Sequence, residues 1–462
     1  MFAFCKGRRA SLIVVLWLPL VISAQSRTYS LRELINSAAR HLPLLKEKEA
    51  SVNSYKAVIT DTRHQFLPTM RINDQVNLGT ANSLAGAYLP FGVNPSVSAG
   101  VRDQNDWRTA TGNLAVLYSE YELADFGLKS ARIDNAIAYA NVEQADFERI
   151  LYQTKLEVSR LYFNLLKDQF KLAADSENIR RYQAIYTVIK ALSLSGIRPG
   201  SDTSLSKAEL SKAIINYNQT LGELVTLKQE LAYWSGIDAV DLQTDTSALH
   251  SFSNYQSPVG LPIDTIHNPL IDFYVKQRTA FLSNETLIRK SYLPKILLAG
   301  STWARGSGIQ YDDKYGSFSD GLGYQRFNYM VAIGVTYDLF NSIHKRDRLT
   351  IGKFQTQASE FALRQEQLSL SNASLQADNA LQTAINNLRE LPVQLQSAKD
   401  VYEQKMAQYK AGLITLIDLT NASFVLYRSQ TDYIETMSDW YLASLDKAAA
   451  IGNLDSFIQS IK

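Results

Sequence analysis

Two segments of the chain, 69–79 and 328–339, alternate apolar residues with polar or small residues at a period of two. Such alternation is typical of β-strands that have one apolar and one polar face. In the first segment, Asp74 is the residue that breaks the apolar side. Residues 112–123 and 295–305 show the same pattern more weakly. We therefore predict four strands of about ten residues each, the length of a tilted strand that crosses a membrane.

Helical periodicity covers most of the remaining chain. We predict a helix over 30–66 that starts at Ser30, because Glu33 follows three residues later in a capping-box pattern. Pro68 and Pro294 directly precede two of the predicted strands. Proline removes a backbone donor and biases the residue before it toward extended backbone, so each of these prolines should end a helix.

The longest predicted helices cover 127–195 and 342–411. At ~1.5 Å per residue, each would extend on the order of 100 Å. Pro392 should kink or break the second one. Shorter helices at 202–235 and 418–451 run back from their ends, with apolar residues at spacings of three and four. Helices of this length cannot bury themselves in one globule and need neighbours alongside, as in coiled coils.

The chain also repeats itself. Pro43 and Pro269 are 226 residues apart, as are Pro68 and Pro294, and further downstream the offset becomes 216. A fixed offset over most of the chain indicates two copies of one architecture. The pairs related by 216 residues include Tyr121 and Tyr337, Leu123 and Leu339, Gly196 and Gly412, Asp202 and Asp418, and Gly236 and Gly452.

These repeats suggest how the chain is divided. We expect a first structural repeat at 25–236 and a second at 267–452, each with a helix, a strand pair and two long helices. The segment 237–266 is rich in Ser, Asp and Thr and has no periodicity, so we interpret it as a linker between the two repeats. A short tail, 453–462, follows the second repeat.

Residues 1–24 have the composition of a signal peptide. Basic residues precede an apolar segment at 11–22, and small residues follow it before Gln25, where we expect the mature chain to begin. This apolar segment is too short to span a bilayer, which argues against an N-terminal membrane anchor. Cys5, the only cysteine, lies within the leader. Beyond the leader no apolar run reaches the roughly 18 residues of a membrane helix, so the chain is either soluble outside the cytoplasm or crosses a membrane as strands.

Charge and side-chain chemistry indicate neither an enzyme nor a nucleic-acid-binding protein. Lys and Arg number 47 against 45 Asp and Glu, so no basic surface is indicated. The histidines are scattered without metal-ligand spacing, and Asp312, Asp313 and Asp320 lack the spacing of a known cation loop. We therefore predict no catalytic residue, no cofactor and no metal site.

Four strands create a physical difficulty if they cross a membrane. An open sheet has two edges, and each unsatisfied backbone group in hydrocarbon costs several kcal/mol. Membrane barrels contain about eight strands or more. Several chains must then contribute to one barrel, and the long helices would continue the tube on one side of the membrane.

The order of these elements, together with several motifs, resembles the TolC-like outer membrane efflux proteins of Gram-negative bacteria over nearly the whole mature chain. The motifs are YELADFG and YDLF at the strand exits, the duplicated Y-x-x-G-x-x-x-x-x-D turns, and above all YKAGLITLIDLTNA followed by a return helix that ends in AAAIGNL. The resemblance implies an α+β membrane protein. Each chain of a homotrimer would give four transmembrane strands to a twelve-stranded β-barrel in outer-membrane lipid, and the long helices would build a hollow coiled-coil barrel in the periplasm. The resemblance further implies that the linker 237–266 and the tail 453–462 fold partly against the middle of this helical barrel, as an equatorial region.

The same resemblance implies a function and partners. Members of the family are passive export conduits of tripartite efflux or type I secretion systems. They dock on a periplasmic adaptor (membrane fusion) protein and on an inner-membrane RND or ABC pump, which supplies the energy. No cofactor and no nucleic acid takes part in this function.

By this resemblance the two turns between paired helices are the periplasmic tips that meet the adaptor. Gly412, Leu413 and Thr415 match the docking segment in the second repeat, and Gly196 and Ile197 match it in the first. The second turn should expose an apolar Leu-Ile-Thr surface. In the first turn the sequence Arg-Pro-Gly at 198–200 replaces the usual apolar residues.

The resemblance also implies an acidic gate at the periplasmic entrance, just past the second tip. Asp418 stands at one gate position, Asn421 stands where a second acidic residue is usual, and Asp202 is the counterpart of Asp418 in the first repeat. A ring of three Asp418 side chains would attract cations. We also expect the tip glycines to end their helices and the two aspartates to be the N-caps of the next ones.

Two other classes of protein are considered. A secreted, soluble coiled-coil structural or adhesive protein would pack the four strands on its helices. A general diffusion porin would need more strands and no long helices, so the sequence argues against it.

Overall fold

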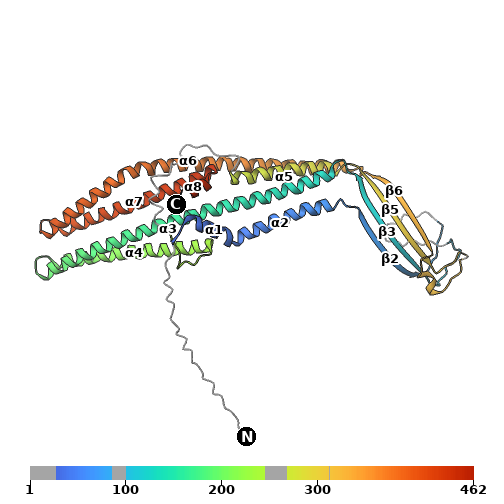
Figure 1. Ribbon diagram of the computed structural model, residues 1–462, viewed down its shortest axis with the longest axis horizontal. Coiled ribbons are helices and arrows are strands. Elements are labelled where there is room, and N and C mark those ends of the chain that lie inside the picture. Colours follow the sequence, from blue (N-terminus) through green and yellow to red (C-terminus); the bar gives the residue numbers. More distant parts are fainter. Residues whose placement is uncertain (1–27, 86–99, 245–267, 312, 462) are drawn as a thin grey trace, which may run out of the picture.

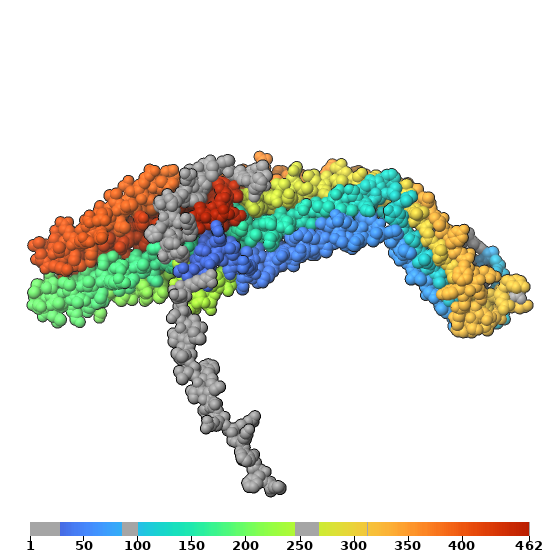
Figure 2. Space-filling model, in the orientation of Figure 1, coloured from blue at the N-terminus to red at the C-terminus, as the bar shows by residue number. Residues whose placement is uncertain are grey.

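The chain forms an elongated, arched body of long helices with a sheet at one end (Figures 1 and 2). The computed structural model describes residues 28–85, 100–244, 268–311 and 313–461. The predicted leader at 1–24 and most of the linker at 237–266 lie outside these residues.

The first helical segment consists of two helices where one was predicted over 30–66. These are α1, Leu31–His41, and α2, Pro43–His64. Leu42 between them has extended backbone, because the residue before a proline is disfavoured in the helical region. The predicted capping box is present at the start of α1: Glu33 N donates to Ser30 Oγ at 3.3 Å, and Ser30 N donates to the Glu33 carboxylate at 3.0 Å.

The sheet contains β2, Thr69–Gly79; β3, Ala110–Ala124; β5, Lys295–Ser307; and β6, Arg326–Thr336. Their order is β2-β3-β5-β6, and every neighbouring pair is antiparallel. Each strand overlaps a predicted one. The last ends at Thr336, three residues before the predicted end, because the chain turns there toward the next helix. Within this chain β2 and β6 are the open edges of the sheet.

The strand register separates an apolar face from a polar face. Asp74 breaks the apolar face as expected, and its carboxylate accepts a hydrogen bond of 2.9 Å from the hydroxyl of Tyr324 in the loop between β5 and β6. The sheet extends beyond the helices, which do not cover it (Figure 1). The apolar face carries Met70, Ile72, Val76, Leu78, Leu117, Tyr121, Leu298, Phe327, Tyr329, Val331, Ile333 and Val335. The polar face carries Arg71, Asn73, Gln75, Asn77, Glu120, Glu122, Ser301, Arg305, Arg326 and Asn328.

Two long helical hairpins form the other end of the molecule (Figure 1). The first pairs α3, Leu128–Leu194, with α4, Gly200–Ser235. The second pairs α6, Asn341–Lys410, with α7, Leu416–Ile451. Between the hairpins and the sheet, α5, Pro269–Ser291, packs against both α3 and α6.

Of the kink or break expected at Pro392, the break is wrong, because α6 continues through this residue without interruption. Proline lacks the backbone donor that would bond one turn back, so the helix is short of one hydrogen bond at this point. The flanking turns supply enough bonds and packing to keep the helix continuous. Within the described residues, no helix is both long enough and apolar enough to cross a membrane.

The core lies at mid-length, where α1, α3, α4 and α7 meet the C-terminal helix α8, Leu454–Ser460. Phe163 stacks on Tyr441 with 5.0 Å between ring centroids and meets the edge of Phe457 at 6.0 Å. Close by, the two-residue strands β1, Thr28–Tyr29, and β4, Gln243–Thr244, pair in parallel. The start of the linker, at Gln243–Thr244, and the C-terminal helix α8 therefore lie near the middle of the helices.

Candidate functional site

The second helical tip joins α6 to α7 through a glycine turn. Gly412 has φ of 77°, a left-handed backbone that favours glycine. The turn returns two amides to the end of α6: Gly412 N donates to Tyr409 O, and Leu413 N donates to Gln408 O, each at 3.0 Å. These bonds satisfy carbonyls that the helix end would otherwise leave free.

The N-cap of α7 is Thr415 and not Asp418, so the predicted N-cap role of Asp418 is wrong. Thr415 Oγ1 accepts a hydrogen bond of 3.3 Å from Asp418 N, and the Asp418 carboxylate accepts one of 3.0 Å from Thr415 N. This is a capping box in which Asp418 takes the third helical position. The Thr415 hydroxyl also donates to this carboxylate at 2.6 Å. Together, the hydrogen bonds from Thr415 lower the pKa of the exposed Asp418 carboxyl.

The exposed apolar surface of the second tip differs from the predicted Leu-Ile-Thr segment. Leu413 is 75% exposed, but Ile414 is half-buried against the small apolar core under the tip. The next exposed apolar side chain is Ile417, at 61%. Sequence reasoning missed Ile417, which lies in the first turn of α7, next to the buried Leu416.

The first tip has the same backbone as the second. Gly196 has φ of 73°, Gly196 N donates to Ser193 O at 3.1 Å, and Ile197 N donates to Leu192 O at 3.0 Å. Each of these residues lies 216 positions before its counterpart in the second tip. The duplication seen in the sequence therefore extends to the hydrogen bonds of the turn.

The start of α4 lacks the cap that α7 has. Its N-cap is Pro199, which has no side-chain acceptor, so the predicted N-cap role of Asp202 is also wrong. Asp202 lies in the first turn of α4, and its amide donates to Pro199 O at 3.2 Å. Ile197, next to the turn, is 66% exposed.

Arg198 joins the two tips, a contact that sequence reasoning did not find. Its Nη2 donates to Ile414 O at 3.3 Å, and its guanidinium carbon lies 5.1 Å from the centroid of the Tyr409 ring. Tyr409 is buried, and this burial raises the pKa of its hydroxyl. The one signal in the sequence was the basic residue in a turn that is usually apolar.

The predicted gate residues lie on two tips. Asp418 and Asn421 are both exposed and three positions apart on α7, so they share one side of this helix. Asp202 is half-buried on the other tip. Among the described residues no hydrogen bond or ion pair joins Asp202 to Asp418.

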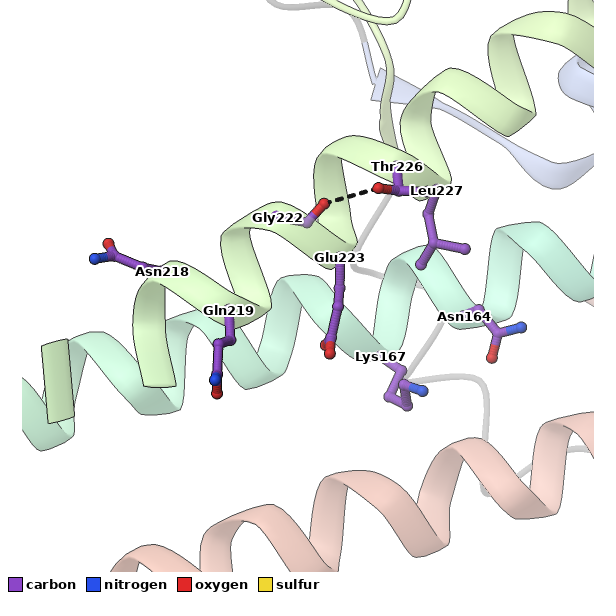
Figure 3. Close-up of a pocket in the computed structure, with 8 residues that line it drawn as sticks. All are labelled: Asn164, Lys167, Asn218, Gln219, Gly222, Glu223, Thr226 and Leu227. Atoms are coloured by element: carbon purple, nitrogen blue, oxygen red, sulfur yellow. Dashed lines mark hydrogen bonds between the residues drawn. The ribbon is translucent and has the colours of Figure 1, made fainter. Parts of the chain in front are cut away.

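A groove of about 980 Å³ lies between α3 and α4, away from the tips. Its lining holds one basic and one acidic side chain, Lys167 and Glu223, and Glu223 is already 3.7 Å from Lys171. Nothing in this lining pairs a nucleophile with a base. In the parts of the chain that the structure describes, no three potential ligands gather to hold a metal ion. Figure 3 shows the lining: Asn164, Lys167, Asn218, Gln219, Gly222, Glu223, Thr226 and Leu227.

Comparison with solved structures identifies the fold. The chain is similar to CusC, with 16% identity and a TM-score of 0.76 over 97% of this chain and 99% of that one. It is also similar to the Campylobacter jejuni CmeC outer membrane channel, with 13% identity, a TM-score of 0.74 and coverage of 100% and 98%. The Vibrio cholerae outer membrane protein VceC matches at 13% identity, with a TM-score of 0.71 and coverage of 91% and 96%.

Comparison with protein-family models shows which family the chain belongs to. No curated protein sequence matches it significantly. A family model described as "Outer membrane efflux protein" matches residues 34–236 and 267–453, which is most of the chain. The alternative of a secreted soluble coiled-coil protein is not supported, and the sheet does not pack on helices as that alternative required. The chain belongs to the outer membrane efflux protein family and is an outer-membrane efflux channel.

Proposed function

We propose that three copies of the chain close a twelve-stranded barrel in the outer membrane of a Gram-negative cell. The observation that carries this proposal is the sheet with two open edges and an exposed apolar face, at the end of a long helical body. Open edges are too costly in hydrocarbon to remain unpaired. Because β2 and β6 run in opposite directions, β6 of one copy can pair antiparallel with β2 of the next.

An exposed apolar stripe on α6 supports the same assembly. Its large members recur at a heptad spacing on the side of the helix that faces away from the rest of the chain, and Phe361 is 62% exposed. A heptad stripe is the seam by which one long helix packs on another, so a helix of a neighbouring copy would cover it. The stripe consists of Ile351, Phe354, Phe361, Leu368 and Leu375.

In this trimer the helical hairpins project into the periplasm as a hollow tube, and the two tips of each chain form its entrance. The tips dock on a periplasmic adaptor, and an inner-membrane pump of the RND or ABC class supplies the energy for export. Gly196 and Ile197 on one tip and Gly412, Leu413 and Thr415 on the other form the docking surface. Their exposure and their apolar character support this role.

Three Asp418 carboxylates, with Asn421 one turn further along α7, line the entrance and attract cations. The low pKa of Asp418 keeps this ring charged at neutral pH. Asp202 takes the corresponding place on the first tip. Since Asn421 carries no charge, the second tips of the three chains form one acidic ring at the entrance, that of Asp418, and not two.

The test is the mass and conductance of the purified protein. In mild detergent we expect a trimer by native mass spectrometry, and in planar bilayers we expect channels that conduct ions. A monomer without conductance would contradict the proposal. A phenylalanine-to-glutamate change at Phe361 should weaken the trimer, whereas the matched change Phe318→Glu in the loop between β5 and β6 should leave it intact.

A further inference from the structure

Two arginines face each other on the polar side of the sheet, at the end furthest from the helices. Arg305 of β5 and Arg326 of β6 are direct partners in the last rung of this strand pair. The rung is well held, since Gln325 N donates to Arg305 O at 2.7 Å and the Gln325 side chain bonds to the loop at Ser307 O and Asp320 O. Both arginines are exposed.

Like charges directly opposite each other destabilise a strand pair, so such a pair normally has an acidic neighbour. Here neither arginine forms an ion pair with any described residue. The loop acids of the described chain have other partners: Asp106 binds Arg108, Asp313 binds Arg102, and Asp320 bonds to Ser317. Asp103 contacts neither arginine within ion-pair distance.

Strand pairing in a closed barrel would not neutralise them either. The polar side of β3 next to Arg305 carries Gly112, Leu114 and Val116, and its acids, Glu120 and Glu122, lie at the helical end of the sheet. The polar side of β2, which would be the neighbour of β6 in the next copy, carries Thr69, Arg71, Asn73, Gln75 and Asn77. None of these is acidic, so this conclusion does not depend on the register between copies.

We propose that Arg305 and Arg326 form an anion-binding site inside the outer end of the barrel, which takes the phosphate group of a solute in the lumen. Two guanidinium forks suit a multiply charged oxyanion, because each can donate two parallel hydrogen bonds. Three copies place six guanidinium groups around one lumen with low-dielectric walls, where fields of one sign are focused. This inference rests on the proposed trimeric barrel, and it adds a ligand class and a position within the lumen.

The experiment uses the full-length protein in planar bilayers, with inorganic phosphate as the probe. Phosphate added on the loop side should reduce the ionic current through the wild-type channel. The double variant Arg305→Gln, Arg326→Gln should raise the half-blocking phosphate concentration by about tenfold or more, and each single variant by about threefold. The double variant Arg305→Lys, Arg326→Lys keeps the positive charge but lacks the guanidinium forks. Its half-blocking phosphate concentration should lie between that of the wild type and that of the double glutamine variant. Arg71→Gln, at the helical end of the same polar face, is the matched control and should leave the block within about twofold of the wild type.

Four outcomes would overturn the site. Equal block of wild type and double variant, with both trimeric by native mass spectrometry, would place phosphate elsewhere in the channel. A conducting wild type that phosphate does not block would exclude the site while leaving the proposed channel intact, whereas a wild type that does not conduct would overturn both. If block requires lipid A in the bilayer and not phosphate in solution, the arginines bind the phosphate groups of the lipid and not those of a solute in the lumen.

Discussion

The two helical tips share one backbone but differ in chemistry. Each turns at a glycine with positive φ and returns the same pair of amides to the preceding helix. The second tip caps its next helix with Thr415 and exposes apolar side chains. The first has Pro199 at the cap and directs Arg198 into the second tip. A duplicated turn can therefore keep its geometry through glycine while its capping and its surface diverge.

This difference suggests a division of labour under the proposed function. In that proposal, the second tip would present the apolar surface that an adaptor buries, and the first tip would hold the second in place through Arg198. The predictions below change one tip and use the other as its comparison.

The largest expected effect is that of Gly412→Trp on export. Gly412 has a backbone that L side chains rarely adopt, so the substitution should strain the turn by about 1–2 kcal/mol. An added Cβ would meet nothing within 4 Å in this chain, so the bulk of the indole should project from the turn onto the docking surface. We expect export of a pump substrate to drop by about tenfold or more, as for a change at an interface hot spot, with a normal amount of trimer in the outer membrane.

Gly196→Trp is the matched variant, because it has the same positive φ and equally open space. If the second tip provides most of the docking surface, this variant should lose less export. Equal losses would remove the proposed asymmetry, and normal export by Gly412→Trp would exclude docking at that tip.

The next largest expected effect is that of Arg198→Ala on the local stability of the second tip. The change removes a cation–π contact with Tyr409 and a hydrogen bond to Ile414 O. A partly buried contact of this kind contributes about 1 kcal/mol, or about a fivefold change in local opening. Amide exchange of residues 412–414 should accelerate accordingly. Arg180→Ala, which removes an exposed pair with Glu177 on the same helix, should not alter exchange at the tip.

A third pair of variants exchanges the caps of the two tips. Thr415→Ala removes the capping box and should destabilise the first turn of α7 by about 1 kcal/mol. Pro199→Thr places a hydroxyl three residues before Asp202 and should stabilise the first turn of α4 by about 0.5 kcal/mol. Hydrogen exchange of the two first turns should shift in opposite directions, and a shift in the same direction would show that the cap does not set their stability.

The smallest effect concerns pH at the entrance. Since hydrogen bonds from Thr415 lower the pKa of Asp418, its charge and its contribution to stability are present above the ordinary carboxyl pKa of about 4. Both are lost only as the pH falls through the lower pKa of the folded state. Cation selectivity of the channel should therefore stay constant from pH 7 to about 5 and decline below about 4. Asp418→Asn should reduce selectivity at neutral pH, and unchanged reversal potentials in this variant would exclude Asp418 from the gate.

Much of the fold could be predicted from the sequence. Period-two alternation identified the strand at 69–79 to the residue, because successive side chains of a strand point to opposite faces and its apolar and polar residues alternate accordingly. The offset of 216 residues located both glycine turns, which depend on single residues that no other type replaces easily. The break at Leu42 was missed by the prediction of one helix over 30–66, although Pro43 after it is the kind of residue that starts a helix.

The parts that were missed depend on contacts between residues far apart in the sequence, or on which of two neighbouring residues caps a helix. Thr415 and Asp418 both suit a helix start, and only the observed backbone shows that the threonine takes the cap. Arg198 reaches a tyrosine in the other repeat, which no local pattern could reveal. Asp74 interrupts an apolar face without an apparent reason in the sequence. Its partner, the hydroxyl of Tyr324, lies 250 residues away along the chain.

The continuity of α6 past Pro392 has a mechanical consequence. From the core near Leu381 to the tip at Lys410, the helix is a lever arm of about 45 Å, at ~1.5 Å per residue. A tilt of about 5° at the core would therefore displace the tip by roughly 4 Å. The missing hydrogen bond at Pro392 makes this arm easier to bend, and Ser176, at the corresponding place in α3, leaves the other arm stiff.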